Sequence, residues 1–453
     1  MVASIKARAH LDFDRLHSLD REDKVLVIDR VNGRWVMLPI SVKCLLPLLC
    51  APANSISDQR LEARVEELAR LLAERGIGIA PPLEHKSLNT VILKLTKVCN
   101  LACSYCYDFE PDDRILHQQT KIILDVIRQA IDMSTGVTNF ILHGGEPMLV
   151  WNMIEQLVTF GESYGQEEGV DVRFIGQTNL TQLDQRKVNF SMLHGIRWGV
   201  SLDGNGNLND KFRVFHNGAG SYEAIRQKIA MFPEFIQRSN ALSTITASNQ
   251  SHLLEIACHM QSLGFAGWDW TLFQPIGRGR QETHFEYDVD ALIHAWDELF
   301  DAILQGQFIG FAVEPILKYL NNFIDGPVAN MCMRSQCGAS RDLLSVSFDG
   351  TIEACDCIDP CGDLAHLGHM ENGGLTVAYS SEKADFIRSR NVEMLQCGSC
   401  LWQAVCGGTC LARAGGIYEI CQNECKLSLH AFDRISSSIA ASDSLLRYKL
   451  SCS

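Results

Sequence analysis

The stretch that decides the fold is Asn89–Tyr107, with the sequence NTVILKLTKVCNLACSYCY. Its first eight residues are rich in β-branched and aliphatic side chains, which is typical of a buried strand. Cys99, Cys103 and Cys106 follow in the pattern CxxxCxxC. Three thiolates on one loop can hold three irons of a [4Fe–4S] cube and leave the fourth open to a small chelating molecule. A zinc site would need a fourth ligand nearby, and the loop offers none.

Composition narrows the class of protein. The chain has 453 residues, 46% hydrophobic and 21% charged, with a formal net charge of −14. The acidic balance argues against nucleic acid as a partner, because phosphate binding requires an excess of Lys and Arg. No apolar run is long enough to span a membrane, and the N-terminus has no apolar segment typical of a secretory signal. We therefore expect a cytoplasmic protein without membrane or nucleic-acid partners.

The 18 cysteines are unevenly distributed. Three lie at 99–106 and eleven lie between Cys332 and Cys425. Closely spaced cysteines in a reducing compartment indicate metal ligands rather than disulfides. The four scattered cysteines are expected to be small buried apolar residues, and they are Cys44, Cys50, Cys258 and Cys452.

The pattern along the chain predicts four parts: 1–85, 86–325, 326–430 and 431–453. In the first, two strand-like runs flank Asn32-Gly33, which is a hairpin signal, and helical spacing follows over 61–72. In the second, strands and helices alternate, which predicts an α/β fold with a parallel sheet and functional loops at the carboxyl ends of its strands. The third is rich in cysteines and loops, and the last is expected to be a C-terminal helix.

The segment CNLACSYCY, with Tyr105 before its last cysteine, resembles the signature of the radical S-adenosylmethionine (SAM) family. The resemblance implies a partial (β/α)6 barrel of the TIM type. A [4Fe–4S] cluster on Cys99, Cys103 and Cys106 would bind SAM and cleave it to a 5′-deoxyadenosyl radical. Further family motifs are a GGEP turn, a TN pair in which Leu180 replaces the usual glycine, an SLDG strand end and a following arginine. The implied SAM-binding residues are Tyr105, Gly144, Gly145, Glu146, Pro147, Thr178, Asn179, Ser201, Asp203 and Arg213.

The second cysteine region resembles the SPASM domain of radical SAM peptide maturases. One half of the pattern is Cys337-x12-Gly350-x4-Cys355, and the other is Cys397-x2-Cys400-x5-Cys406-x3-Cys410. The resemblance implies two auxiliary clusters, hence three [4Fe–4S] clusters in all. The inner cluster would bind Cys337, Cys355 and Cys410, with Cys332, Cys357, Cys361 or an open site as the fourth position. The outer cluster would bind Cys397, Cys400, Cys406 and Cys425, for which Cys421 is the competing candidate.

Two further expectations concern the substrate. The N-terminal unit resembles the winged-helix-like, PqqD-like recognition element of ribosomal-peptide maturases, which implies that a precursor's leader peptide pairs with the edge of the KVLVIDR or RWVMLPI strand. Asp356 stands where sulfatase-maturing relatives carry a catalytic base. The preferred function is therefore an oxidoreductase that cross-links side chains of a precursor peptide, for example as a cyclophane, with electrons from an external flavodoxin or ferredoxin. The alternatives are sulfatase maturation, dehydrogenation of a small molecule, and an electron carrier without chemistry of its own.

Overall fold

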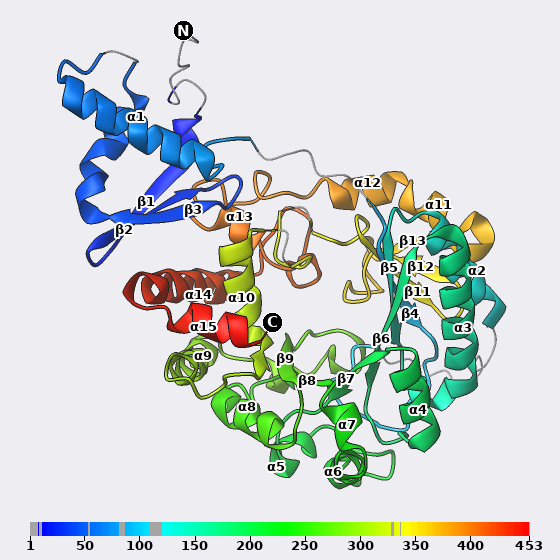
Figure 1. The fold of residues 1–453 in the computed structure, drawn as a ribbon. Helices are drawn as coiled ribbons and strands as arrows, with labels where there is room; N and C mark the ends of the chain where they lie inside the picture. The colour runs from blue at the N-terminus through cyan, green and yellow to red at the C-terminus, as the bar shows by residue number, and fades with distance from the viewer. Residues whose placement is uncertain are drawn as a thin grey trace.

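The structure is a computed structural model, and it describes residues 8, 11–52, 55–80, 87–108, 120–327, 330–335 and 337–452. Three parts follow one another along the chain (Figure 1). The first is an N-terminal module, the second is a curved sheet flanked by helices, and the third is a cysteine-rich segment that ends in helices. Of the linker expected at Ala80-Pro81-Pro82, the two prolines lie outside the described residues.

The N-terminal module is a three-stranded antiparallel sheet packed against a helix. The elements are β1 (Leu16–Arg21), β2 (Lys24–Asp29), β3 (Trp35–Pro39), a 3₁₀ helix (Ile40–Cys50) and α1 (Gln59–Glu74). The hairpin predicted around Asn32-Gly33 is confirmed, because β2 pairs with β3 and Gly33 has a φ of 72°. Since β2 lies between β1 and β3, the expectation that KVLVIDR offers a free edge is wrong. Both of its edges are already paired. Of the two strands proposed from sequence only RWVMLPI, which forms β3, lies at an edge of the sheet, and β1 forms the other edge.

The centre of the molecule is a parallel sheet with the order β10-β9-β8-β7-β6-β5-β4-β11, which confirms the predicted α/β class. The strands are β4 (Thr90–Lys94), β5 (Val137–His143), β6 (Asp171–Thr178), β7 (Arg197–Ser201), β8 (Asn240–Ile245), β9 (Gly267–Leu272) and β10 (Ala312–Val313). The helices are α2 (Thr120–Asp132), α3 (Trp151–Glu168), α4 (Gln185–Leu193), α5 (Gly206–Asn209), α6 (Tyr222–Met231), α7 (Pro233–Ile236), α8 (Leu253–Ser262), α9 (Val289–Leu304) and α10 (Glu314–Asp325). The sheet curves, and the helices between its strands lie on its outer side (Figure 1). This arrangement directs the carboxyl ends of the strands toward one shared space.

The cysteine-rich segment extends this same sheet. Strand β11 (Leu343–Ser347) lies parallel to β4, and β12 (Thr351–Glu353) and β13 (His366–His369) add antiparallel strands beyond it. An Asp349-Gly350 turn joins β11 to β12, and Gly350 has a positive φ of 92° that favours glycine. Lys94 of β4 pairs with Glu353 of β12 at 3.0 Å, and Asp356, three residues later, accepts a hydrogen bond from Tyr107, which follows the first cysteine loop.

The rest of the C-terminal part is loops and helices. The helices are α11 (Gly374–Tyr379), α12 (Glu382–Arg388), α13 (Gln403–Cys406), α14 (Gln422–Ala441) and α15 (Ser444–Ser451). The predicted C-terminal helix is present, but α14 begins nine residues before the expected boundary at 431 and therefore includes Cys425. Within the described ranges, no helix is both long enough and apolar enough to cross a membrane.

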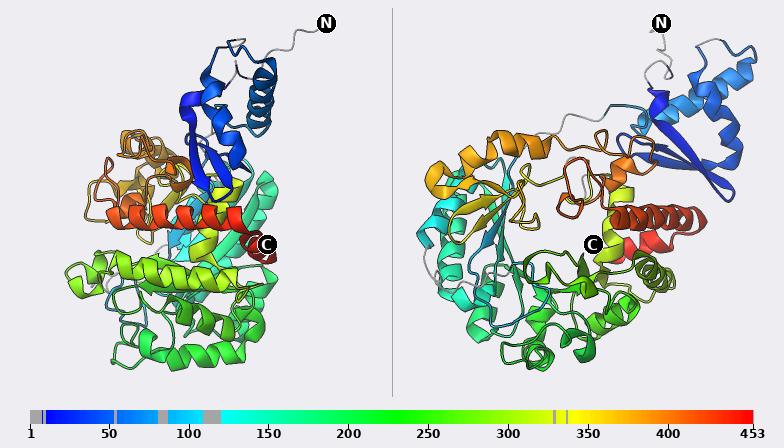
Figure 2. Two further views of the ribbon diagram at one scale, coloured as in Figure 1. Left: turned by 90° about the vertical axis from the view of Figure 1, so that its left-hand side faces the viewer. Right: turned by 180° about the vertical axis from the view of Figure 1, so that it is seen from behind.

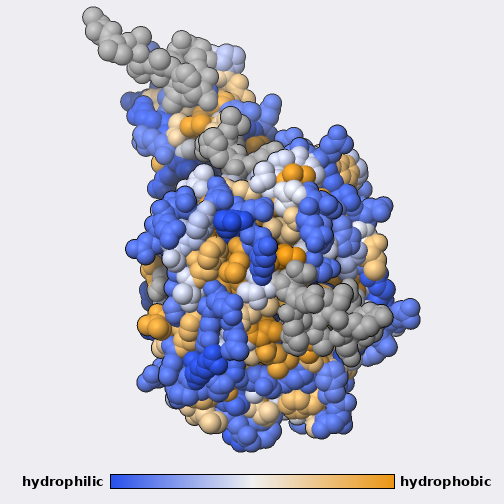
Figure 3. Space-filling model, turned by 90° about the vertical axis from the view of Figure 1, so that its right-hand side faces the viewer, coloured by the Kyte–Doolittle hydropathy of each residue, from blue (hydrophilic) through white to orange (hydrophobic). Residues whose placement is uncertain are grey.

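The N-terminal module has its own apolar core, yet it is held against the rest of the chain. Figure 2 shows it projecting from one end of the molecule. Trp35 stacks on Phe323 of α10 with 4.6 Å between ring centroids, and Arg21 pairs with Asp433 of α14. The face shown in the space-filling view of Figure 3 is largely hydrophilic, with separate hydrophobic patches.

Candidate functional site

The first three cysteines share one cavity at the carboxyl end of the parallel sheet. Cys99, Cys103 and Cys106 all line this space, whose volume is about 130 Å³. The loop that carries them is anchored through backbone hydrogen bonds from Gly145 N to the Thr96 carbonyl (2.6 Å) and from Ala102 N to that of Val214 (2.7 Å). Burial raises the pKa of the Cys99 thiol to about 12. A thiol in this setting needs a bound cation to become a thiolate ligand.

Gly144 and Gly145 are required by the approach of two backbone segments. A Cβ on Gly144 would lie 2.4 Å from the carbonyl oxygen of Thr96, and one on Gly145 would lie 2.2 Å from that of Val98. Only glycine allows a backbone to come this close. The GGEP turn therefore positions the strand that leads into Cys99, in addition to lining the cavity.

Glu146 braces the ends of two strands. Its buried carboxylate accepts hydrogen bonds from Thr178 Oγ1 (2.6 Å), Asn179 N (2.7 Å) and Met148 N (3.0 Å). Burial raises the pKa of this carboxyl to about 6, although the three donors oppose the shift. Both oxygens are engaged by the protein, and neither Glu146 nor Pro147 lines the cavity. The SAM contact expected at these two residues stays a prediction.

The other residues expected to contact SAM lie around the same cavity. Those that line it are Tyr105, Thr178, Asn179, Ser201 and Arg213. Asp203 lies behind them, 2% exposed, where it accepts a hydrogen bond from the Tyr105 hydroxyl and pairs with Arg213 at 3.0 Å. Asp203 thus orients two lining residues. Leu180, which replaces the family's usual glycine, keeps a left-handed φ of 66°, so the turn has the conformation that glycine favours.

Asp356 reaches the cavity wall through a chain of hydrogen bonds. The Tyr107 hydroxyl donates to Asp356 Oδ2 at 2.9 Å and lies 3.2 Å from His143 Nε2. His143 Nε2 lies 3.1 Å from Gln177 Oε1, and Gln177 Nε2 donates to Ser201 Oγ at 3.4 Å. Since a carboxylate only accepts, the Tyr107 proton points to Asp356, and Nε2 of a neutral His143 is left as the donor. This series of hydrogen bonds links the cysteine-rich segment to the ends of β5, β6 and β7.

The inner cysteines are brought together from separate segments. Cys410 interacts electrostatically with Cys337 and Cys357. Cys332 interacts in the same way with Cys337, Cys357 and Cys410. Cys355 Sγ, an Asp356 carboxylate oxygen and Cys357 Sγ lie within 4.8 Å of one another. Cys357 also lines the cavity of the first three cysteines. Cys361 is exposed and lies beside the Arg280–Asp359 pair, so it is the fourth-ligand candidate that the structure keeps apart.

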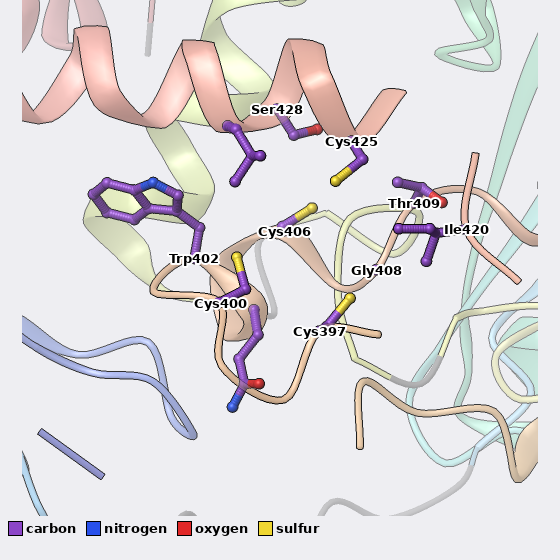
Figure 4. Close-up of a pocket in the computed structure, with 11 residues that line it drawn as sticks. Cys397, Cys400, Trp402, Cys406, Gly408, Thr409, Ile420, Cys425 and Ser428 are labelled. Carbon is purple, nitrogen blue, oxygen red and sulfur yellow. The ribbon is translucent and has the colours of Figure 1, made fainter. Parts of the chain in front are cut away.

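The outer cysteines converge on a small enclosed pocket. Its lining contains Cys397, Cys400, Cys406 and Cys425, whose sulfur atoms point toward a common space (Figure 4). The rest of the lining includes the apolar residues Trp402 and Ile420 and the polar residues Gln403, Thr409 and Ser428. Burial raises the pKa of the Cys406 thiol to about 11. Cys421 is not part of this lining, so the structure brings Cys425, and not Cys421, to the other three.

Three residues at the site were missed from sequence: Tyr107, His143 and Gln177. A signal was present for all three, because each directly adjoins a motif that had been recognised. Among the scattered cysteines, the expected burial is wrong for Cys44 and Cys50, which are exposed. They lie on the 3₁₀ helix of the N-terminal module, whose buried side is formed by Leu45 and Leu49.

Comparison with known proteins agrees with this geometry. Residues 93–250 match the model of the Radical SAM superfamily. The cysteine-type anaerobic sulfatase-maturating enzyme of Clostridium novyi (strain NT) is 23% identical over 345 residues, which cover 72% of this chain and 88% of that protein. The match identifies a radical SAM domain, and that family implies a [4Fe–4S] cluster and SAM.

Two solved structures share the fold. Native anSMEcpe with bound AdoMet and the Kp18Cys peptide has a TM-score of 0.67 and 18% identity, covering 78% of this chain and 99% of that one. Streptococcus suis SuiB bound to its precursor peptide SuiA has a TM-score of 0.56 and 15% identity, covering 92% of this chain and 99% of that one. The SuiB match is larger than residues 86–453 alone can supply, so it includes part of the N-terminal module.

Proposed function

We propose that this chain is a radical SAM enzyme that oxidises a ribosomally made precursor peptide and joins two of its side chains. The observation that carries the proposal is the shared position of two features. Three thiols of one loop open into a cavity, and the hydrogen-bond chain from Asp356 ends on the wall of that same cavity. An electron carrier would need neither an open cavity nor an acid–base group beside it.

The donor set suits iron–sulfur clusters. Three Sγ atoms from one loop match a cluster with one open iron, and the four converging thiols of the outer pocket match a fully ligated one. With clusters bound, the first would supply the electron that cleaves SAM, and the inner and outer auxiliary clusters would accept the electron removed from the substrate. The inner set is Cys337, Cys355 and Cys410, with Cys332 or Cys357 as the fourth ligand.

The chain's own residues bind and orient. Asn179 Nδ2 lies 3.7 Å from Cys99 Sγ, and Arg213 lies over the Tyr105 ring at 5.4 Å from its centroid. These side chains and Ser201 would hold SAM against the first loop. Asp356 would take the substrate proton as the new bond forms, and the Tyr107 hydroxyl would keep this carboxylate turned toward the cavity.

The N-terminal module would recruit the peptide. Strand β3 pairs with β2 on one side and, among the described residues, with no strand on the other. A groove of about 470 Å³ runs beside it, lined by Leu38, Val42 and Leu45 and by α1 side chains that include Arg64 and Glu67. An extended leader would pair with β3 and place apolar side chains in this groove. The overlap with the peptide-bound SuiB fold supports this role.

Sulfatase maturation is the second candidate. It is favoured by the similarity to the sulfatase-maturating enzyme of Clostridium novyi and by the fold shared with anSMEcpe. In that reaction one Cys or Ser of a protein substrate becomes formylglycine, and no leader-binding module is required. The N-terminal module is the feature that favours the first candidate.

The test uses the anaerobically reconstituted full chain, dithionite, SAM and a candidate precursor encoded beside its gene. We expect loss of two hydrogen atoms per cross-link, and tandem mass spectrometry should find no backbone fragments between the joined residues. Asp356→Asn should lower product formation by about 10²–10⁴-fold while 5′-deoxyadenosine still forms. The matched control is Asp363→Asn, at an exposed loop carboxylate.

Two outcomes would contradict the proposal. A product that reacts with hydrazides, from a Cys or Ser of a sulfatase peptide, would establish maturation instead. An unchanged product yield with Asp356→Asn would remove this carboxylate from the reaction. Loss of 5′-deoxyadenosine in the same variant would show that Asp356 acts on SAM cleavage rather than on the substrate.

A further inference from the structure

One carboxylate joins the inner and outer cysteine groups. Glu424 is 8% exposed and lies in the first turn of α14, directly before Cys425 of the outer pocket. Its Oε2 accepts a hydrogen bond of 2.9 Å from the backbone N–H of Cys410, a member of the inner group. Its Oε1 pairs with the guanidinium of Arg413. The side chain therefore connects the segment of one group to the helix of the other.

The charges around the two groups differ. Arg413 lies beside Cys410, whose carbonyl accepts a hydrogen bond of 3.2 Å from the Arg413 backbone N–H, and its positive charge also interacts with Cys332. A second arginine, Arg390, is shared by the two groups, because its charge interacts with Cys337 and Cys410 as well as with Cys397. Arg390 is held by the carbonyls of Gly408, Thr409 and Glu419. Arg413, in contrast, interacts with the inner cysteines Cys410 and Cys357, and its place is set by Glu424.

We propose that Arg413 and Glu424 are a positioning pair that sets the reduction potential of the inner auxiliary cluster relative to the outer one. The inference rests on the proposed function, because it takes both cysteine groups as cluster sites. A nearby cation stabilises the more negative, reduced state of a cluster and so raises its potential, while an anion lowers it. The inner site, which lies nearer the substrate cavity, thereby becomes the first acceptor of the electron that the substrate loses.

The test is a potentiometric titration of the anaerobically reconstituted full chain, followed by electron paramagnetic resonance. Arg413→Met removes the cation and should lower the inner potential. Glu424→Gln removes the anion, keeps an acceptor for the Cys410 N–H, and should raise it. At a fixed ambient potential the reduced-to-oxidised ratio should change about tenfold in each direction. The double variant should stay below the wild-type value, but by less than Arg413→Met, because the arginine is the stronger of the two charges at Cys410. The outer cluster should shift less in all three.

Two further variants separate charge from structure. Arg413→Lys keeps the positive charge and should keep the inner potential. Arg434→Met removes an arginine from the far end of α14, where it pairs with Asp297 and Asp301, and should change neither cluster. If Arg413→Met does not retain the inner cluster, the upward shift in Glu424→Gln still decides the question.

Shifts of the same sign in Arg413→Met and Glu424→Gln, or equal shifts in both clusters, would overturn the inference. So would the absence of any shift in variants whose iron content matches the wild type, and in that case the cluster assignment would stand. A wild-type protein without auxiliary clusters after reconstitution would overturn the assignment itself, and with it this inference. Iron and sulfide analysis of each sample distinguishes these two failures.

Discussion

The cysteines of residues 99–106 and those of residues 332–425 are brought together in different ways. The first three lie on one loop, and their cavity opens toward residues from β5, β6 and β7. The outer four come from a loop, α13 and the start of α14, and they close an apolar pocket of their own. A loop can present ligands and leave a coordination position open, whereas ligands from several directions enclose what they bind. The first geometry suits binding and chemistry, and the second suits electron storage.

The sharpest way to break this comparison is to remove the open site alone. Replacing Cys99, Cys103 and Cys106 together with Ala should reduce 5′-deoxyadenosine formation to background, because the ligands of the cluster that would bind SAM are then removed. The auxiliary iron and its visible absorbance should remain, since those ligands are untouched. Full SAM cleavage in this variant would show that the radical chemistry lies elsewhere.

The closed site can be tested with two cysteines at the start of α14, the N-cap residue Cys421 and Cys425 in the first turns of the helix. Cys425→Ala removes a thiol that points into the outer pocket, so the protein should lose the iron of one cluster and part of its thermal stability. Cys421→Ala is the matched control, one helical turn away and outside the lining, and it should keep all of its iron. Equal iron in the two variants, measured by metal analysis, would contradict the assigned outer set.

The smallest expected effect concerns Glu146, whose carboxylate holds the ends of two strands together behind the open site. Glu146 has a pKa of about 6 in the fold against an ordinary 4.5, so the folded state binds its proton more tightly than the unfolded state does. Protonation of Glu146 therefore raises the free energy of unfolding of the metal-free protein as the pH falls from about 6 toward 4.5, by up to about 2 kcal/mol.

The measurement is urea unfolding at pH 7 and pH 5. Glu146→Gln should reduce the increase in the free energy of unfolding that is expected between pH 7 and pH 5. Glu167→Gln, at an exposed position of α3, should leave that increase unchanged. If Glu146→Gln and the wild type show the same dependence on pH, the brace does not titrate in this range.

The open site could be predicted from the sequence because its three ligands lie in one short segment. The spacing of Cys99, Cys103 and Cys106, the strand before them and the GGEP turn can all be read locally. The α/β class followed from alternating strands and helices for the same reason. The role of Glu146 as a brace was not readable, because it depends on donors from the end of β6 that only the fold brings near.

Less of the cysteine-rich region at residues 332–425 could be predicted from the sequence. The pairing of β11 with β4 joins residues about 250 positions apart, and no local pattern reports such a contact. Yet the Asp349-Gly350 turn between LLSVS and TIE was a visible hairpin signal within a segment interpreted as loops. That hairpin delivers Asp356 to Tyr107 and Cys357 to the cavity, so the missed element is the one that joins the two cysteine regions.

The central claim is that the loop of Cys99, Cys103 and Cys106 holds a cluster with one iron free to bind SAM. Electron–nuclear double resonance on the reduced full chain, with SAM carrying ¹⁵N in its amino group, measures this contact directly. The account predicts a hyperfine coupling between that nitrogen and the cluster, present in the wild type and absent when the three cysteines are replaced. A reduced cluster on this loop without such a coupling, or zinc in its place, would contradict the account.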